Sequence, residues 1–425
     1  MNKTIIKISM LFVLIVLESC SKEEDIVVVP EKPVATLLSI YPTNGPKNTL
    51  VTINGTNFGS DKTKVQVFFN GKKAEIDNLS DTVITAIVPP KASTGTIGLK
   101  VEGKEAVLGP RFVYELTAEV NTYVGAEVYL SNARGVAIDK EGTLYIADKL
   151  RHAIFCKKPN EAVKIFAGNG EGMVNGNIDE AKFNSPSGIA VDEEGNILIA
   201  DSGNNRIRKI TPEGMVYTLA GGRSGGSDGQ GMNAQFSNPS GIALGPEGNI
   251  YVSDSRSHRI RKITPEGLVS TLAGSTVGYS DGFGNVAQFY NPMGLTVDSN
   301  GIVYVADNEN QRIRKIMPNG EVTTLTGKTE GFKNGSLETA LFDYPSGVAI
   351  DNSENLIIAD TDNHRIRIIT KDGSVKTLAG SSEGTTNGTG VDAKFKNPYG
   401  ICIGPQGSIY VADTGNHSIR KIILE

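Results

Sequence analysis

The sequence predicts an all-β protein in which an immunoglobulin-like sandwich precedes a six-bladed β-propeller closed by an N-terminal strand. The propeller rests on a repeat, because an aspartate recurs six times at a fixed interval of 53 residues and a glycine keeps the same interval. A repeat of this length marks a stack of similar supersecondary units. The repeat aspartates are Asp148, Asp201, Asp254, Asp307, Asp360 and Asp413, and the repeat glycines are Gly135, Gly188, Gly241, Gly294, Gly347 and Gly400.

One unit, residues 188–241, shows what each repeat contains. Four short β-rich runs, at 188–192, 197–201, 206–210 and 216–221, alternate with turns rich in Gly, Asn and Pro. A four-stranded meander cannot bury both of its faces alone. Radial repetition packs each sheet between two neighbours and leaves only short edges. The repeat therefore predicts six blades around a central axis.

The two ends of the repeat region predict how the ring closes. The sixth unit supplies only three strands, the last at 418–422. The segment Val-Asn-Thr-Tyr-Val-Gly at 120–125 matches the fourth-strand segment Val-Lys-Thr-Leu-Ala-Gly at 375–380, although it precedes the first unit. We therefore expect this N-terminal strand to complete the sixth blade and to remove its open edge.

The repeat resembles a known family over about residues 116–425. Its segments Gly-Ile-Ala-Val-Asp, Ile-Leu-Ile-Ala-Asp, Arg-Ile-Arg-Lys-Ile and Thr-Leu-Ala-Gly are similar to those of the NHL repeat. The first blade departs most, with Ala153, Phe155 and Cys156 where other blades carry Arg, Arg and Lys, and its inter-blade loop is shorter. The resemblance implies a binding scaffold more often than one particular chemistry.

Residues 34–115 differ in composition and suit a separate domain. Short alternating strands are expected at 50–59, 67–71 and 84–89, between Gly and Asn turns. Many short strands within roughly 80 residues suit an immunoglobulin-like sandwich. The segments Ile-Tyr-Pro-Thr-Asn-Gly and Thr-Ile-Asn-Gly-Thr-Asn-Phe-Gly resemble the IPT/TIG domain. That resemblance implies a domain that spaces or orients its neighbour.

Residues 1–20 predict a lipoprotein signal peptide. Basic residues lie ahead of an apolar run at 10–17, which has the length of a signal-peptide core and is too short to span a bilayer. The run ends at Leu-Glu-Ser-Cys, which resembles a lipobox with Cys20 as the acylated residue, although Glu18 replaces the usual small residue. We therefore expect lipid on Cys20 to anchor the protein to a membrane.

Residues 21–33 predict a linker that also carries a sorting signal. The start of the linker, Ser-Lys-Glu-Glu-Asp, resembles the acidic tag that sends some Gram-negative lipoproteins to the outer leaflet. An ordinary acidic linker is the alternative. The resemblance implies an outer-membrane protein that faces the cell exterior, with an outer-membrane transport complex as a candidate partner.

The charge balance argues against nucleic acid as a partner. The chain has 42 basic and 47 acidic residues, a net charge of −5, and so offers no basic surplus to a phosphate backbone. The basic segment 206–210 recurs blade after blade, which favours inter-blade ion pairs and a solvated rim. Cys156 and Cys402 fall on different strands of neighbouring blades, so we expect two free thiols rather than a disulfide.

The four histidines share one position of the repeat, four residues after the aspartate, where the two remaining blades carry Asn and Gln. A position that accepts these three residue types predicts a hydrogen-bonding turn. No histidine is then left for a general base or a zinc ligand, and the channel mouth has no carboxylate for calcium. We therefore assign no catalytic residue, no metal and no cofactor. The position is filled by His152, Asn205, His258, Gln311, His364 and His417.

Positions that vary between blades predict a ligand site. In a meander, the second-to-third turns and the long inter-blade loops share one face of the disc, which we call the looped face. The residue before each repeat glycine should ring the mouth of the central channel there. Three of these are large, namely Arg134, Met293 and Tyr399, and the loops add the aromatic residues Tyr279, Phe283, Tyr290, Phe332 and Tyr344.

These residue types suit the binding of a sugar, because aromatic faces stack on it while hydroxyl groups and an arginine form hydrogen bonds. The resemblance to surface lipoproteins of polysaccharide-capture systems implies an extracellular glycan, bound without catalysis. Two alternatives remain open. A propeller enzyme acting on a sugar lactone, ester or uronate would need a metal or acid/base cluster on the looped face. A protein-interaction scaffold in an outer-membrane complex would show a broad apolar patch.

Overall fold

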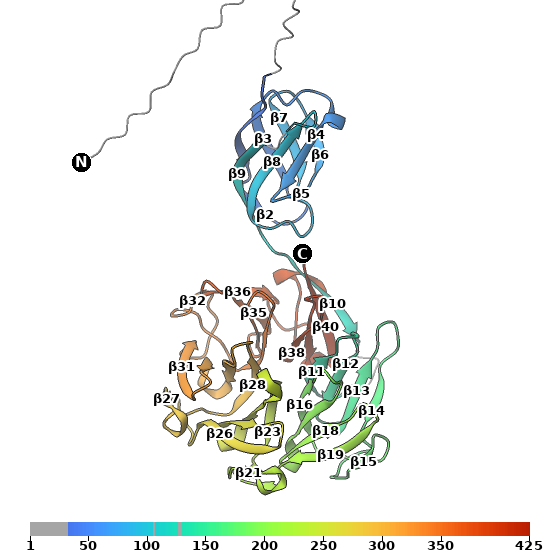
Figure 1. The fold of residues 1–425 in the computed structure, drawn as a ribbon, viewed down its shortest axis with the longest axis vertical. Helices are drawn as coiled ribbons and strands as arrows, with labels where there is room; N and C mark the ends of the chain where they lie inside the picture. Colours follow the sequence, from blue (N-terminus) through green and yellow to red (C-terminus); the bar gives the residue numbers. More distant parts are fainter. Residues whose placement is uncertain (1–32, 105–106, 126–129) are drawn as a thin grey trace, which may run out of the picture.

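The computed structural model describes residues 33–104, 107–125 and 130–425. Strands dominate these ranges, and the helical segments within them are short 3-10 turns. Two bodies follow one another along the chain, a small one and a large ring (Figure 1). The predicted signal peptide, with the acylation site Cys20, lies outside the described residues.

The small body is a two-sheet sandwich. One sheet has the strand order β1-β3-β7-β6 and the other β2-β9-β8-β4-β5. Alternate residues of β3 enter the core, so Val51 and Ile53 are fully buried, and the rings of Phe69 and Phe112 meet edge to face at 5.1 Å. The elements are β1 (Thr36–Tyr41), β2 (Asn44–Gly45), β3 (Leu50–Thr56), η1 (Lys62–Lys64), β4 (Val65–Phe69), β5 (Lys72–Lys73), β6 (Glu75–Leu79), β7 (Val83–Ile87), β8 (Gly95–Val101) and β9 (Val107–Tyr114).

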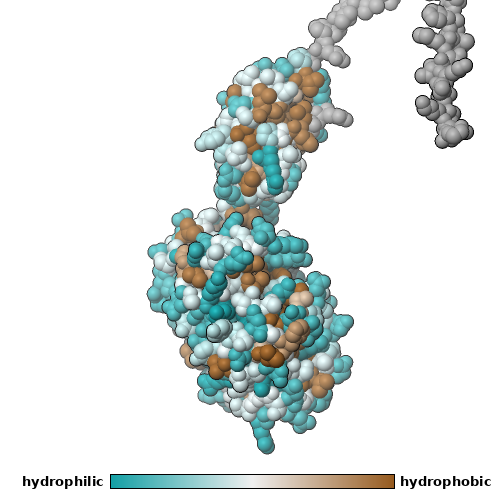
Figure 2. Space-filling model, turned by 90° about the vertical axis from the view of Figure 1, so that its left-hand side faces the viewer, coloured by the Kyte–Doolittle hydropathy of each residue, from teal (hydrophilic) through white to brown (hydrophobic). Residues whose placement is uncertain are grey.

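The surface of the sandwich carries several exposed apolar residues. Figure 2 shows brown, hydrophobic groups gathered on the smaller body. Exposed fractions reach 67% for Leu38, 76% for Tyr41 and 70% for Leu108. Exposed apolar groups that lie together are a common feature of contact surfaces.

The large body consists of six antiparallel sheets, each with four main strands, which confirms the predicted six-bladed propeller. The inner strands follow one another around the axis, and the ring closes where β38 meets β11 (Figure 1). Each long inter-blade loop adds a two-residue outer strand.

The main strands run from the axis outward in every blade. Blade 1 has β11 (Ala133–Ile138), β12 (Leu144–Asp148), β13 (Ala153–Lys157) and β14 (Lys164–Ala167). Blade 2 has β16 (Pro186–Val191), β17 (Ile197–Asp201), β18 (Arg206–Ile210) and β19 (Met215–Ala220). Blade 3 has β23 (Pro239–Leu244), β24 (Ile250–Asp254), β25 (Arg259–Ile263) and β26 (Leu268–Gly274). Blade 4 has β28 (Pro292–Val297), β29 (Val303–Asp307), β30 (Arg312–Ile316) and β31 (Glu321–Thr326). Blade 5 has β33 (Pro345–Ile350), β34 (Leu356–Asp360), β35 (Arg365–Ile369) and β36 (Ser374–Ala379).

Blade 6 confirms the predicted closure. It has β38 (Pro398–Ile403), β39 (Ile409–Asp413), β40 (Ser418–Leu424) and, as its outer main strand, β10 (Ala118–Val124). Strand β10 pairs with β40 in antiparallel register, and Val120 lies opposite Ile422 with both side chains fully buried. The backbones of Thr117 and Glu425 extend the pairing through bonds of 2.8 and 3.0 Å.

Short outer strands and 3-10 turns complete the ring. The outer strands are β15 (Gly176–Asn177), β21 (Gly229–Gln230), β27 (Gly282–Phe283), β32 (Gly335–Ser336) and β37 (Gly388–Thr389), with the pair β20 (Arg223–Ser224) and β22 (Gln235–Phe236) in one loop. The turns are η3 (Ser202–Asn204), η4 (Gly231–Asn233), η5 (Pro246–Gly248), η6 (Ser255–Ser257), η7 (Gly284–Val286), η8 (Asn308–Asn310), η9 (Gly390–Asp392) and η10 (Thr414–Asn416).

A buried arginine fastens each long inter-blade loop to its blade. Arg314 is fully buried, donates to Asp307 at 2.7 Å and to Asp281 at 2.7 Å, and lies 5.0 Å from the ring of Phe289. It also donates to two loop carbonyls. The interpretation of these arginines as inter-blade ion pairs on a solvated rim was wrong, because each is buried, pairs with the aspartate of its own blade and bonds to the loop that precedes that blade. The equivalents are Arg208, Arg261, Arg367 and Arg420.

Burial also governs the repeat aspartates. Loss of water raises the pKa of Asp254 and Asp360 to about 6, although an arginine lies beside each. Blade 1 has Phe155 in place of the arginine, and there Asp148 accepts the backbone N–H groups of Ser131 and Asn132 at 2.6 and 3.0 Å. Thus every repeat aspartate accepts a backbone N–H from the segment that leads into its blade. The arginine is present only in the blades whose preceding loop is long.

The sandwich meets the propeller at blade 6. Lys47 forms an ion pair with Glu425 and lies 3.9 Å from Glu119, and the N–H of Glu115 donates to the carbonyl of Gly45. Strand β40 starts at the looped face and runs away from it. Its end at Glu425 therefore places this junction on the opposite side of the disc, which leaves the looped face free of the sandwich.

Candidate functional site

The mouth ring consists of the residues before the repeat glycines, and the structure places all six around a small axial cavity of about 70 Å³. The guanidinium carbon of Arg134 lies 4.0 Å from the centre of the Tyr399 ring, and the Tyr399 hydroxyl lies 3.0 Å from Sδ of Met293. The remaining members are Ser187, Ser240 and Ser346.

A hydrogen bond to Asn132 fixes the orientation of the Arg134 side chain. Its Nε donates to Oδ1 of Asn132 at 2.8 Å, while its guanidinium covers one of the two faces of the Tyr399 ring. An arginine held in this way keeps its other N–H groups available for a planar or anionic group. The three large residues predicted at the mouth therefore form one contiguous group.

A second ring, which sequence reasoning missed, lies directly behind the mouth ring. We call it the turn ring, and it consists of the first residue of each second-to-third turn. Five members donate a side-chain hydrogen bond of 2.5 to 3.0 Å to the carbonyl that begins the inner strand of the next blade. The sixth member is Lys149, which has no such bond among the described residues. The ring reads Lys149, Ser202, Ser255, Asn308, Thr361 and Thr414.

Two of the predicted loop aromatics pair with arginines instead of facing the mouth ring. Tyr279 and Phe332 occupy the same repeat position in blades 4 and 5 and are exposed by 64% and 43%. Arg312 lies 4.8 Å from the first ring, and Arg365 lies 4.0 Å from the second. Each pair presents an aromatic face backed by a cation at the entrance of a loop.

Tyr290 and Tyr344 enter the looped face at adjacent repeat positions of neighbouring blades. The N–H of Tyr290 donates to Asp307 at 2.8 Å, and its ring meets that of His258 edge-on at 5.8 Å. Tyr344 has φ of +47°, a left-handed conformation that is unusual for a bulky residue. Its N–H donates to Gln311 at 2.6 Å, which holds this conformation.

Phe283 lies apart from the other candidates. It belongs to β27, the outermost strand of blade 4, and is paired with Glu321. Four strand spacings of about 4.8 Å separate this strand from the inner strand that carries Met293. The structure therefore brings Phe283 to the perimeter of the disc.

The looped face is electrically divided. Over blades 4 and 5, Glu309 is the main cause of a raised pKa of Tyr344, followed by burial and by Glu330, Asp343 and Asp362. Burial, Glu330 and Asp362 likewise raise the pKa of Asp343. The mouth ring near Arg134 and Lys149 is basic. This division arises from different blades, and no single motif in the sequence signals it.

The histidine position is a turn, as predicted. Its six members adopt left-handed φ values between +52° and +58°. Nδ1 of His152, His258 and His364 accepts a backbone N–H of the following blade at 3.1 to 3.2 Å. Within the described ranges, no three His, Cys, Asp or Glu side chains are grouped so as to hold a metal ion. Cys156 and Cys402 are free thiols, and burial raises the pKa of each.

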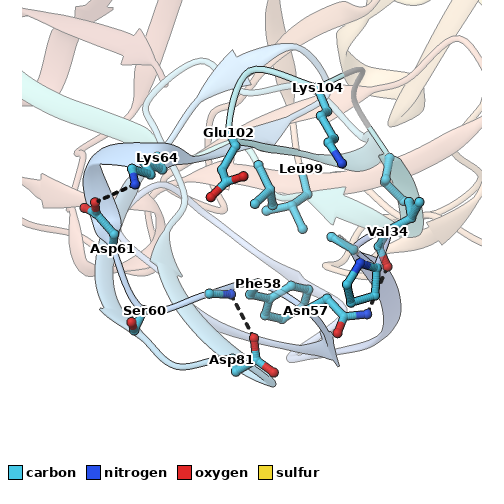
Figure 3. A pocket seen from close by; sticks show the side chains of 15 residues that line it. Val34, Asn57, Phe58, Ser60, Asp61, Lys64, Asp81, Leu99, Glu102 and Lys104 are labelled. Carbon is cyan, nitrogen blue, oxygen red and sulfur yellow. Dashed lines mark hydrogen bonds and ion pairs between the residues drawn. The ribbon is translucent and has the colours of Figure 1, made fainter. Parts of the chain in front are cut away.

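A larger cavity of about 390 Å³ lies in the sandwich, close to the start of the described chain. Its floor is formed by Phe58 and Leu99, and several of its polar groups bond to one another (Figure 3). Asp61 lies 3.7 Å from Lys64, and Asp81 accepts the N–H of Gly59 at 3.0 Å. Polar groups that already bond to one another offer little to a ligand, so the mouth ring is the better candidate site.

No helix in the part of the chain that the structure describes is long and apolar enough to cross a membrane.

Two family models match the chain. The IPT/TIG domain model matches residues 35–114. The NHL repeat model matches residues 183–210, 236–263, 289–316, 342–369 and 395–422. The chain therefore contains an IPT/TIG domain and five NHL repeats, which confirms both resemblances. These five segments belong to blades 2 to 6, and blade 1 is the one that departs most from the pattern.

Relatives and solved structures agree with this assignment. NHL repeat-containing protein 2 of Bos taurus is 30% identical over 326 residues, which are 66% of this chain and 45% of that protein. The chain thus spans about half the length of the curated relatives it matches.

Two solved structures from Bacteroides share the fold of both bodies. A structural genomics protein of unknown function from Bacteroides thetaiotaomicron has a TM-score of 0.60 at 20% identity, over 93% of this chain and 99% of that one. An auxiliary nutrient binding protein from Bacteroides ovatus has a TM-score of 0.58 at 20% identity, over the same shares.

Proposed function

We propose that this IPT/TIG and NHL-repeat chain is a surface lipoprotein that binds an extracellular glycan at the mouth ring of its propeller and does not transform it. The observation that carries the proposal is the group formed by Arg134, Tyr399 and Met293. An aromatic face held against a guanidinium offers a sugar both stacking and hydrogen bonds at one place.

The arrangement of the two domains supports this use of the looped face. The sandwich joins the propeller at blade 6 on the opposite side of the disc, through Lys47 and Glu425. A lipid on Cys20 would tether the chain through the sandwich. The mouth ring would then be directed away from the membrane, where a soluble polysaccharide arrives.

The chemistry of the described residues favours capture over turnover. The histidines of the looped face are engaged in backbone hydrogen bonds, and the repeat aspartates are buried, five of them beside an arginine. The Bacteroides ovatus protein with the same fold is described as an auxiliary nutrient binding protein, which is consistent with a binding role here. An outer-membrane transport complex remains the candidate partner.

The test is a glycan array with the purified protein, followed by calorimetry and by product analysis of the bound sugar. Capture predicts saturable binding with the glycan recovered unchanged. Release of shorter or ring-opened products would favour the enzyme alternative. Binding to no glycan would contradict the proposal.

A protein contact made by the sandwich is a second candidate, favoured by its exposed apolar residues such as Leu38 and Leu108. Leu38→Lys with Leu108→Lys should then reduce co-purification of outer-membrane proteins without changing glycan binding. Unchanged co-purification would exclude this face as the contact.

A further inference from the structure

Lys149 is the exceptional member of the turn ring. The other five side chains are short and donate to the next blade, whereas the ammonium group of Lys149 forms no ion pair or hydrogen bond within the described residues. Its backbone N–H donates to the carbonyl of Asn132 at 2.9 Å, and the side chain of Asn132 holds Arg134. Asn132 thus holds the backbone of Lys149 and the side chain of Arg134, which brings the two residues together near the mouth.

A third cation, Arg256, lies in the second-to-third turn η6 of blade 3, on the same looped face. Burial lowers the pKa of Lys149, and the charges of Arg134 and Arg256 lower it further. Both guanidinium groups thus act electrostatically on this ammonium group. Blade 2, which lies between them, has Gly203 at the turn position where blade 3 has Arg256. The three like charges repel one another, and among the described residues no carboxylate forms an ion pair with any of them.

We propose that Arg134, Lys149 and Arg256 form an oxyanion-binding cluster that selects an acidic saccharide, whose ring stacks on Tyr399 while its carboxylate or sulfate lies among the cations. This inference deepens the proposed function and rests on it. A uronic acid carries its carboxylate directly beside the ring, so one sugar reaches both the aromatic face and the cluster. Charge-assisted bonds to such a group are stronger than neutral ones.

The carboxylates of blades 4 and 5 on the looped face limit how long the anionic part of a bound ligand can be. Glu309 and Asp362 stand at the same turn position in blades 4 and 5 as Arg256 does in blade 3. A uniformly charged polyanion lying across the disc would meet these carboxylates. An anionic group confined to one or two sugars meets only the cations, which favours acidic sugars set within a largely neutral chain.

Calorimetry with matched probes tests the inference. The probes are a short oligogalacturonate, its methyl ester and a sulfated disaccharide, each measured at low and high salt. The wild type should bind the acid roughly tenfold more tightly than the ester, as expected for one charge-assisted contact, and added salt should reduce the difference. Tighter binding of the sulfated sugar would identify sulfate as the preferred group and would equally support the cluster.

Lys149→Met removes the charge and keeps most of the apolar length of the side chain. It should abolish the preference for acid over ester, and Arg256→Gln should reduce it, whereas Lys421→Met on the opposite face should leave it unchanged. Without ligand, Lys149→Met should raise the melting temperature because it relieves repulsion among the cations. A purely structural role for Lys149 predicts a lower melting temperature instead.

Two results would overturn the inference. One is equal binding of acid and ester by the wild type, and the other is an unchanged preference in Lys149→Met. If Tyr399→Ala still weakens both probes in either case, the proposed glycan site stands without the oxyanion cluster. If neutral glycans bind and no acidic probe does, the cluster is wrong and the proposed function survives.

Discussion

Gly400 of the last blade lies against the carbonyl oxygen of Arg134 in the first, so that a Cβ on this glycine would fall closer than 3.0 Å to that oxygen. Every repeat glycine has the same relation to the mouth residue of the next blade. This close approach of inner strands explains why the repeat needs glycine. It also shows that the sixth blade docks on the first in the same way as the others do.

We predict that Gly400→Ala destabilises the propeller by about 1–3 kcal/mol, the usual cost of forcing extra volume into a packed site. Scanning calorimetry measures the melting temperature of each variant. Gly98→Ala in the sandwich is the matched control, because a Cβ there meets its nearest neighbour at an ordinary 3.6 Å. Equal melting temperatures for Gly400→Ala and wild type would show that the inner strands can separate without cost.

The buried arginine of blade 4 gives a second prediction. Arg314→Met leaves Asp307 buried without its cation and should cost about 3–5 kcal/mol in denaturant unfolding. Adding Asp307→Asn removes the orphaned charge, so the double variant should regain part of this loss. A double variant as unstable as the sum of the two single variants would contradict the ion pair as the source of the effect.

Closure by β10 is tested with one pair of neighbouring residues. Val120 is fully buried against blade 6, whereas Asn121 is exposed on the same strand. Val120→Asp should lower solubility or melting temperature sharply, because it places an unpaired charge in an apolar core. Asn121→Asp should melt like the wild type. A stable Val120→Asp protein would mean that the ring does not depend on this strand.

The fold was predictable because it repeats. Four strands and one turn chemistry return every 53 residues, so each blade confirms the others, and the strand at 120–125 is recognisable as the missing member of the sixth set. The role of arginines such as Arg314 was not predictable in this way. A charged residue on a strand suggests a solvated face, and the groups that satisfy Arg314 come largely from a loop whose path the sequence does not reveal. One signal was present, since blade 1 lacks both this arginine and the long loop.

The candidate site was predictable only in part. The mouth ring follows from its fixed offset to the glycine, which identified Arg134 and Tyr399. Lys149 escaped notice because its position reads as an ordinary polar turn in the other blades. Where each loop aromatic lies depends on the path of its loop, and Phe283 lies at the perimeter because it belongs to the outermost strand, β27.

Anchoring is a prediction from the sequence alone. Cys20→Ser should abolish labelling with a radioactive fatty acid and release the protein from membranes, because a single acylated cysteine is its expected attachment. Fractionation and labelling of cells expressing both forms measure this. Retention of the unprocessed variant in the membrane would show that residues 1–20 form an uncleaved anchor.

The central claim is that a glycan stacks on Tyr399 at the mouth ring. The direct measurement is calorimetry of the best-binding glycan from the array against Tyr399→Ala and, as an aromatic control, Tyr217→Ala, which removes an exposed tyrosine from the outer main strand β19 of blade 2. Removal of one stacked ring costs about 1–3 kcal/mol. We therefore predict that the dissociation constant rises about five- to 150-fold for Tyr399→Ala and stays unchanged for the control. Wild-type affinity in Tyr399→Ala would contradict it.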